Sequence, residues 1–115
     1  MILPKTMAAD ALVTAIDGGR VVVFARPVGV TAIMKDLLRE YPEVAEVAEI
    51  RRTNGDQSFT FPGGGTVEFR DVGRTVEYRG ACLDRIYVPI GTSQDVLMEI
   101  RPALATSQDG TLTGY

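Results

Sequence analysis

Histidine and tryptophan are absent from this chain, and cysteine occurs once, at Cys82. Without histidine the chain lacks the commonest general base, the usual partner of a nucleophilic serine or cysteine, and the commonest transition-metal ligand. A single cysteine excludes an internal disulfide framework and a cysteine-based zinc site. We therefore expect neither a metal nor a cofactor, and we expect Cys82 to be a small, buried, apolar residue.

Long hydrophobic runs are also lacking, since no apolar stretch approaches the roughly 20 residues that span a membrane. Residues 1–5 are too short and too interrupted for a signal peptide, which predicts a cytoplasmic location. The hydrophobic content of 45% and charged content of 23% are ordinary for a soluble globular protein. A length of 115 residues predicts one domain over residues 1–115.

The chain has fewer basic than acidic residues, and its net charge of −3 argues against a broad nucleic-acid-binding surface. Basic residues are nevertheless concentrated in the second half, where residues 50–85 hold six arginines against five acids. Two interpretations stay open for this segment. One is a small basic patch, and the other is a solvated strand surface.

The first part of the chain predicts a helix, a strand and a second helix. Thr6 is placed to cap a helix that extends to residue 16. Residues 21–24 are an unbroken apolar run with three β-branched residues, which is typical of a parallel strand covered on both faces. Thr31 is placed to cap the next helix, and Pro42 ends it.

A β-rich section follows. Residues 47–52 predict a strand, and Asn54-Gly55 is a strong hairpin signal. Residues 58–61 and 66–70 alternate polar and apolar side chains, with a Pro-Gly-Gly-Gly turn between them. These strands are expected to form a half-exposed antiparallel meander.

The last part returns to the buried sheet with an apolar strand at residues 86–90. Ser93 is placed to start a final helix, which Pro102 bends or ends, and residues 111–113 predict a short strand. The sequence therefore predicts an α/β domain. We expect a mainly parallel sheet with flanking helices and an antiparallel hairpin or meander insert.

Two segments invite a phosphate-binding interpretation. Gly63-Gly64-Gly65 has a strand pattern on both sides, which favours a hairpin turn over a phosphate loop. Lys5-Thr6 is the better candidate, because it opens a helix whose positive end favours an anion. Pro4 stands where a Walker A loop needs glycine, and proline has no amide hydrogen to donate.

The acidic residues give no specific catalytic pattern, because no two have a spacing that argues for acid–base chemistry. Asp84 precedes the strand at residues 86–90, and structural pairing in a turn is its expected role. An enzyme that uses carboxylates alone stays open as one alternative.

Taken in order, these segments resemble the N-terminal ATPase domain of phage terminase large subunits, the motors that drive DNA into procapsids. Lys5-Thr6 and its helix look like the end of Walker A, and residues 20–26 look like the next core strand. Residues 56–70 resemble the hairpin of the family. Arg79-Gly80, three residues and Asp84 resemble the approach to Walker B, and residues 97–114 look like the stretch that leads to the coupling motif.

The departures from the family pattern concern its chemistry. The glycine-rich half of Walker A is absent, and no nuclease domain follows. Pro89 and Ile90 occupy the Walker B positions at which the family carries an Asp for Mg²⁺ and a Glu that activates water. Losing both acids should abolish useful hydrolysis. The strand at residues 86–90 is then expected to be kept for packing.

The resemblance implies a pseudo-ATPase of phage origin, which would act in the host cytoplasm. Since the family core places another strand before Lys5, we expect either an unpaired sheet edge, beside residues 21–24, or an uncovered apolar face, which must be paired or blunted. The expected partner is a second copy, a terminase, a portal protein or a host factor. The alternative is a nucleotide- or DNA-binding regulator without hydrolysis, in which Lys5, Thr6, Arg26 and Arg79 contribute to binding an anion.

Overall fold

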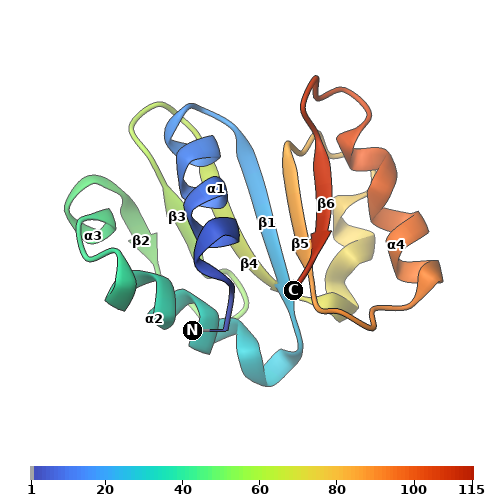
Figure 1. Cartoon of the computed structure of the whole chain (residues 1–115), viewed down its shortest axis with the longest axis horizontal. Helices are drawn as coiled ribbons and strands as arrows, with labels where there is room; N and C mark the ends of the chain where they lie inside the picture. The colour runs from blue at the N-terminus through green and yellow to red at the C-terminus, as the bar shows by residue number, and fades with distance from the viewer. Residues whose placement is uncertain (1) are drawn as a thin grey trace.

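A mixed sheet of six strands forms the middle layer of the fold (Figure 1), which a computed structural model describes for residues 2–115. The strands lie in the order β2-β3-β4-β1-β5-β6. Strands β4, β1, β5 and β6 are parallel to one another, whereas β3 is antiparallel to both β2 and β4. The bounds are β1 (Arg20–Ala25), β2 (Glu49–Arg51), β3 (Ser58–Thr60), β4 (Thr66–Asp71), β5 (Arg85–Val88) and β6 (Thr111–Gly114). The predicted α/β class, with an antiparallel insert, is confirmed.

The central strand β1 is buried on both faces. Val21 and Val23 point into one core, and Val22 and Phe24 point into the other. Alternate side chains of a strand point to opposite faces, so an unbroken apolar run suits a strand with helices on both sides. Strand β5 is buried in the same way. By contrast, β4 alternates buried and partly exposed residues, as expected for a half-exposed meander.

Helices cover the two faces unequally. The helices α1 (Lys5–Ile16), α2 (Val30–Glu40) and α3 (Val44–Val47) pack on one face, and η1 (Pro27–Gly29) leads into α2. The segments η2 (Val72–Tyr78), α4 (Gln94–Ile100) and η3 (Arg101–Leu104) pack on the other face, over β1 and β5 (Figure 1). Within residues 2–115, no helix combines the length and the apolar composition needed to cross a membrane.

The predicted helix starts are partly wrong. Helix α1 begins at Lys5 after Pro4, so Thr6 lies inside its first turn and does not cap it. Helix α2 begins at Val30, and the hydroxyl of Thr31 instead accepts a hydrogen bond of 3.0 Å from Gln57 Nε2. The prediction for α4 is confirmed, because Ser93 Oγ accepts from the Val96 amide.

Two glycine turns build the meander, as predicted. Gly55 has a φ of +91° in the turn between β2 and β3, and Gly64 has a φ of +91° in the turn between β3 and β4. Gly65 is required for a different reason, since a Cβ atom there would lie 1.7 Å from the carbonyl oxygen of Ala15. The glycine-rich segment is therefore a hairpin turn pressed against the end of α1, not a phosphate loop.

Two further local predictions are wrong. Val47 belongs to α3, and β2 begins only at Glu49, because residues 44–47 turn helical to bury Val44. Cys82 is exposed, since its neighbour Leu83 fills the buried position before β5.

The expected packing role of Pro89 and Ile90 is also wrong. Strand β5 ends at Val88, and Pro89 has no amide hydrogen to donate, although the Ile90 amide still donates to the Tyr115 carbonyl at 2.7 Å. The side chain of Ile90 is 75% exposed.

The position of the open sheet edge differs from the prediction. Strand β1 is paired on both sides, with β4 and with β5. The edges of the sheet are β2 and β6. The expected edge beside residues 21–24 is instead covered by β5 of the same chain.

Candidate functional site: the carboxyl end of the parallel strands

The carboxyl ends of β4, β1 and β5 meet at one end of the sheet because these strands are parallel. After β1 the chain passes to the face of α1 and α2, whereas after β4 it passes through η2 to the opposite face. Ligands of open α/β sheets bind in the crevice that such a change of direction creates. Two hollows lie here, one of about 300 Å³ beside β1 and β4 and one of about 320 Å³ beside β1, β5 and β6.

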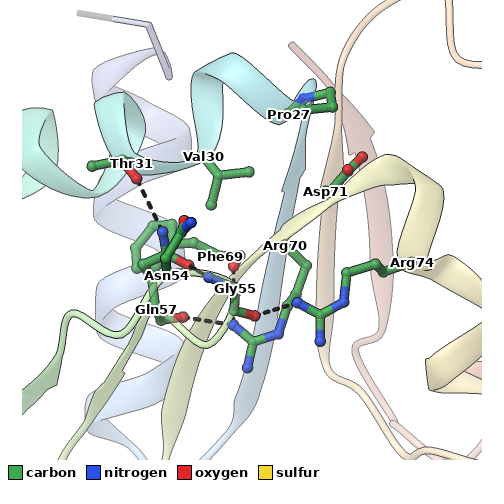
Figure 2. A pocket seen from close by; sticks show the side chains of 10 residues that line it. All are labelled: Pro27, Val30, Thr31, Asn54, Gly55, Gln57, Phe69, Arg70, Asp71 and Arg74. Atoms are coloured by element: carbon green, nitrogen blue, oxygen red, sulfur yellow. Dashed lines mark hydrogen bonds between the residues drawn. The ribbon is translucent and has the colours of Figure 1, made fainter.

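The hollow beside β1 and β4 is built around Gln57, which is buried (Figure 2). Its Nε2 donates to Thr31, and its Oε1 accepts from the Gly55 amide at 2.9 Å. Arg70 Nη1 donates to the carbonyl of Gln57 at 2.7 Å, and Arg74 donates to the carbonyl of Gly55. The two arginines therefore fasten the turn between β2 and β3 to β4 and η2, and much of their donor capacity is already used.

An ionic cluster lies on the adjoining face of β4. Glu68 accepts hydrogen bonds from Arg20 Nε at 2.8 Å, from Tyr78 Oη at 3.1 Å and from Arg70 Nη2 at 3.4 Å. The guanidinium of Arg20 also lies 5.5 Å from the centre of the Tyr78 ring. Burial, helped by the charge of Glu68, raises the pKa of Tyr78. On this face of the sheet, helical segments cover β1 and β5, whereas β4 is partly exposed. The cluster pairs its charges at the boundary between the two.

The second hollow lies where β5 gives way to Pro89 and Ile90. Among the described residues that line it, Arg26 alone is charged, and the others are apolar apart from the Tyr115 hydroxyl. That hydroxyl donates to the carbonyl of Phe24, and burial raises the pKa of Tyr115 to about 12. No aspartate or glutamate is therefore among the described residues that line the hollow into which β5 leads.

Arg26 differs from most arginines of this chain. In residues 2–115 no hydrogen bond or ion pair involves its side chain, whereas seven other basic residues have acidic partners. It follows β1 directly and lies at the edge of the second hollow. It is therefore free to meet an anion.

The other predicted anion-binding residues lie elsewhere. Lys5 pairs with Glu40 of α2 at 3.3 Å, and Thr6 is exposed in the first turn of α1. Arg79 follows η2 and pairs with Glu99 of α4 at 3.1 Å, on the opposite face of the sheet. Arg26 and Arg79 line separate hollows. Anion binding at any of these residues stays a prediction.

Asp84 has the structural role predicted for it. Its Oδ2 accepts from the Arg20 amide at 2.9 Å, and its Oδ1 accepts from Ser107 Oγ at 2.7 Å. Its carbonyl accepts from the Thr111 amide at 3.2 Å. Asp84 therefore ties together the starts of β1, β5 and β6, at the end of the sheet opposite the two hollows.

Sequence reasoning missed Gln57 and Glu68, the two residues that organise the hydrogen bonds around the first hollow. Glu68 occupies a polar position in an alternating strand, where the pattern indicates only exposure to solvent. Gln57 precedes its strand and carries no pattern at all. The roles of these two residues become visible only in the folded structure, where β1, β4 and η2 lie together.

No protein-family model matches the sequence, and no curated protein matches it. The fold is similar to that of the large terminase of a thermophilic bacteriophage in two crystal structures, one of them in complex with ADP. The TM-scores are 0.62 and 0.63, with 12% sequence identity in both cases. The match covers 94% of this chain and only 28% and 29% of the terminase chains, so this chain spans less than a third of their length. The likeness supports the terminase-like fold that the sequence predicted.

Proposed function

We propose that this chain is a non-catalytic, terminase-like module that binds a protein partner in connection with phage DNA packaging. The observation that carries the proposal is the end of β5, where Pro89 and an exposed Ile90 border a hollow with no aspartate or glutamate among its described lining residues. The link to packaging is supported by the likeness of the fold to a large terminase.

Hydrolysis of a nucleoside triphosphate needs a metal ion that neutralises charge on the phosphoryl group and a side chain that orients the attacking water. Carboxylates at the end of a buried strand supply both in the family that the sequence resembles. Here the chain continues from Val88 into Pro89-Ile90, which can do neither. We therefore propose that the chain is not an enzyme.

The same end of the sheet is suited to a protein partner. Ile90 and Val28, whose side chain is 93% exposed, lie with Ile2 around the second hollow. Clustered exposed apolar side chains are characteristic of interaction surfaces. A bound partner would remove them from water, with a gain of roughly 25 cal/mol for each Å² of apolar surface covered.

The neighbouring edge strand β6 offers backbone groups to such a partner. Thr111 and Tyr115 direct their amides toward β5. Because neighbouring residues of a strand bond to opposite sides, Leu112 and Gly114 direct theirs to the open edge. No hydrogen bond of these two outward groups is found among residues 2–115. A segment of a second copy, or of a packaging protein such as a terminase or portal, could add a strand here.

A binding assay tests the proposal directly. The chain is titrated against itself, a purified large terminase and a portal protein, with Ile90→Asp as the test variant and Val76→Asp as the control. Val76 is an exposed valine of η2, away from the hollow. Saturable binding that Ile90→Asp weakens and Val76→Asp preserves is expected. Absence of binding to all three would contradict the proposal.

A second candidate, a nucleotide- or DNA-binding regulator without hydrolysis, is favoured by the free side chain of Arg26. Thermal unfolding with Mg-ATP, ADP or a short DNA duplex distinguishes the two. A ligand at 100 times its Kd stabilises a protein by about 2.7 kcal/mol. Such a shift, abolished by Arg26→Ala, would favour the regulator. ATP turnover above background would exclude both candidates.

A further inference from the structure

Helix α1 carries two apolar stripes. One consists of Ala8, Ala11 and Ala15, which are fully buried against the sheet. The other consists of Ala9, Leu12, Val13 and Ile16, which share one side of the helix by their spacing of three and four residues. Val13 is 56% exposed and Ile16 is 52% exposed. Apart from Leu12, which is buried, the second stripe is thus open to solvent, on the face of the sheet away from η2 and α4.

This stripe forms one wall of a groove whose other wall is the short helix α3. Val47 of α3 is 56% exposed, and the buried Val44 and Phe61 line the groove between the walls. The groove volume is about 190 Å³. Small-molecule sites occupy about 300–1,000 Å³, so this groove suits one or two apolar side chains better than a whole small ligand.

The charged residues beside the groove indicate which kind of partner could bind in it. Glu43 is the one charged residue among the described residues that line the groove, and Glu46 lies three residues further along the chain on α3. Neither has an ion-pair partner in the described part of the chain. A second copy docked about a two-fold axis near this groove would bring its own Glu43 and Glu46 close to these acids, and like charges at an interface are unfavourable.

We infer that this groove binds an amphipathic helix of a partner protein, with apolar side chains at three- and four-residue spacing and lysine or arginine beside them. The apolar stripe of the partner would pack along residues 9–16, as ridges into grooves. Its basic side chains would lie beside Glu43 and Glu46. The site is separate from the hollow at Ile90 and does not depend on the function proposed above.

The probe is an 18-residue acetylated peptide of leucine and lysine with leucine at helical spacing. Two comparison peptides are the same helix with glutamate in place of lysine, and the same composition with leucine and lysine alternating. Binding is measured by calorimetry and by NMR shifts of the full chain. The helical lysine peptide should bind and shift Val13, Ile16 and Val47, and the other two should bind at least about tenfold more weakly, since 1.4 kcal/mol corresponds to tenfold.

Variants of the chain test the groove and its charges separately. Val13→Asp should weaken binding at least about tenfold, because the docked helix would bury the new carboxylate against leucine side chains. Val47→Asp provides the same test on the opposite wall if the first variant folds poorly by circular dichroism. The double variant Glu43→Lys with Glu46→Lys should reverse the preference, so that the glutamate peptide binds more tightly. Asp95→Lys, a single charge reversal on the opposite face, should change nothing.

Three results would overturn the inference. The first is equal binding of the lysine and glutamate helices, which would mean that the acids do not select the partner. The second is undiminished binding to folded Val13→Asp and Val47→Asp. The third is a concentration-dependent dimer of the chain that Val13→Asp dissolves, which would assign the groove to a second copy.

Discussion

The two edges of the sheet are built in opposite ways. Strand β2 has three residues, and its exposed ends are the charged side chains of Glu49 and Arg51. Strand β6 has four residues and no charge, and its outward backbone groups at Leu112 and Gly114 have no partner in the described part of the chain. Short length and charge are the usual means by which an edge strand avoids pairing with another chain. The first edge is therefore protected, and the second is open to a partner.

The two halves of the sheet differ as well as its two edges. The half that ends in β2 is antiparallel, and one of its faces is polar, with Glu68, Arg70 and Ser58 on β4 and β3. The half that ends in β6 is parallel, and helices cover β5 on both faces. A parallel strand with apolar faces has little room for charged residues.

The largest expected effect concerns the attachment of the antiparallel half to α1. The change is Gly65→Ala, which would place a Cβ atom 1.7 Å from the carbonyl oxygen of Ala15. Because backbone atoms must move to relieve this overlap, unfolding free energy should fall by more than about 3 kcal/mol. Urea denaturation followed by circular dichroism measures the loss.

Gly64→Ala is the matched control for this change. Gly64 has a φ of +91° but no atom within 4 Å of an added Cβ. Only the strain of a left-handed alanine remains, which is roughly 1–2 kcal/mol. A loss at Gly65 no larger than that at Gly64 would refute the steric explanation.

The parallel half is tested by Asp84→Ala, which removes the acceptor of the Arg20 amide and of Ser107 Oγ. Hydrogen bonds to a charged group contribute about 1.5–3 kcal/mol each, so the loss of two at the lower value predicts a fall of about 3 kcal/mol. Hydrogen exchange should rise at the starts of β1 and β6 before it rises in β3. As a control, Asp109→Ala at an exposed position should change stability by less than about 0.5 kcal/mol. Uniform acceleration across the whole sheet would contradict a local role.

Most of the fold could be predicted from the sequence because its signals are local. The apolar run at residues 21–24, the turns at Gly55 and Gly64, and the Ser93 cap all act within a few residues, and each is confirmed. Errors arose where a distant contact decides the outcome. Cys82 and Leu83 are equally apolar neighbours, and only the position of α4 and η3 determines which of them is buried.

The candidate site was less predictable than the fold. The absence of acids at Pro89 and Ile90 is visible in the sequence, but the exposure of Ile90 depends on where β5 ends. The pairing of Arg79 with Glu99 depends on the packing of η2 and α4, and the freedom of Arg26 depends on a hollow with no acidic side chain among its described lining residues. No spacing along the chain encodes either of them.

A further test of the comparison exchanges the charges of the two edge strands, β2 and β6. Thr113→Lys adds a charge to β6 and should weaken any self-association, by about tenfold if the edge contributes 1.4 kcal/mol. Glu49→Thr with Arg51→Thr removes the charges of β2 and should create association in a chain that already carries Thr113→Lys. Sedimentation equilibrium across a range of concentrations measures both. If Thr113→Lys leaves association unchanged, β6 is not the interface.

The smallest expected effect is a pH dependence that differs between the two halves. Glu99, on the β6 side, accepts a hydrogen bond from Thr75 and another from Arg79, and these lower its pKa. Glu77 accepts from Arg74, which also holds the turn at Gly55 on the β2 side, and this lowers the pKa of Glu77.

A carboxylate whose pKa is lower in the folded state stabilises the fold above its unfolded pKa of about 4.3. That contribution is lost as the pH falls through the folded pKa, so stability should decline below about pH 4.5. Glu99→Gln should flatten the decline and slow the acid-induced rise in exchange of α4 amides. Glu77→Gln should do the same at Gly55 and leave α4 unaffected. If either variant altered exchange equally on both sides, the two halves of the sheet would open as one unit.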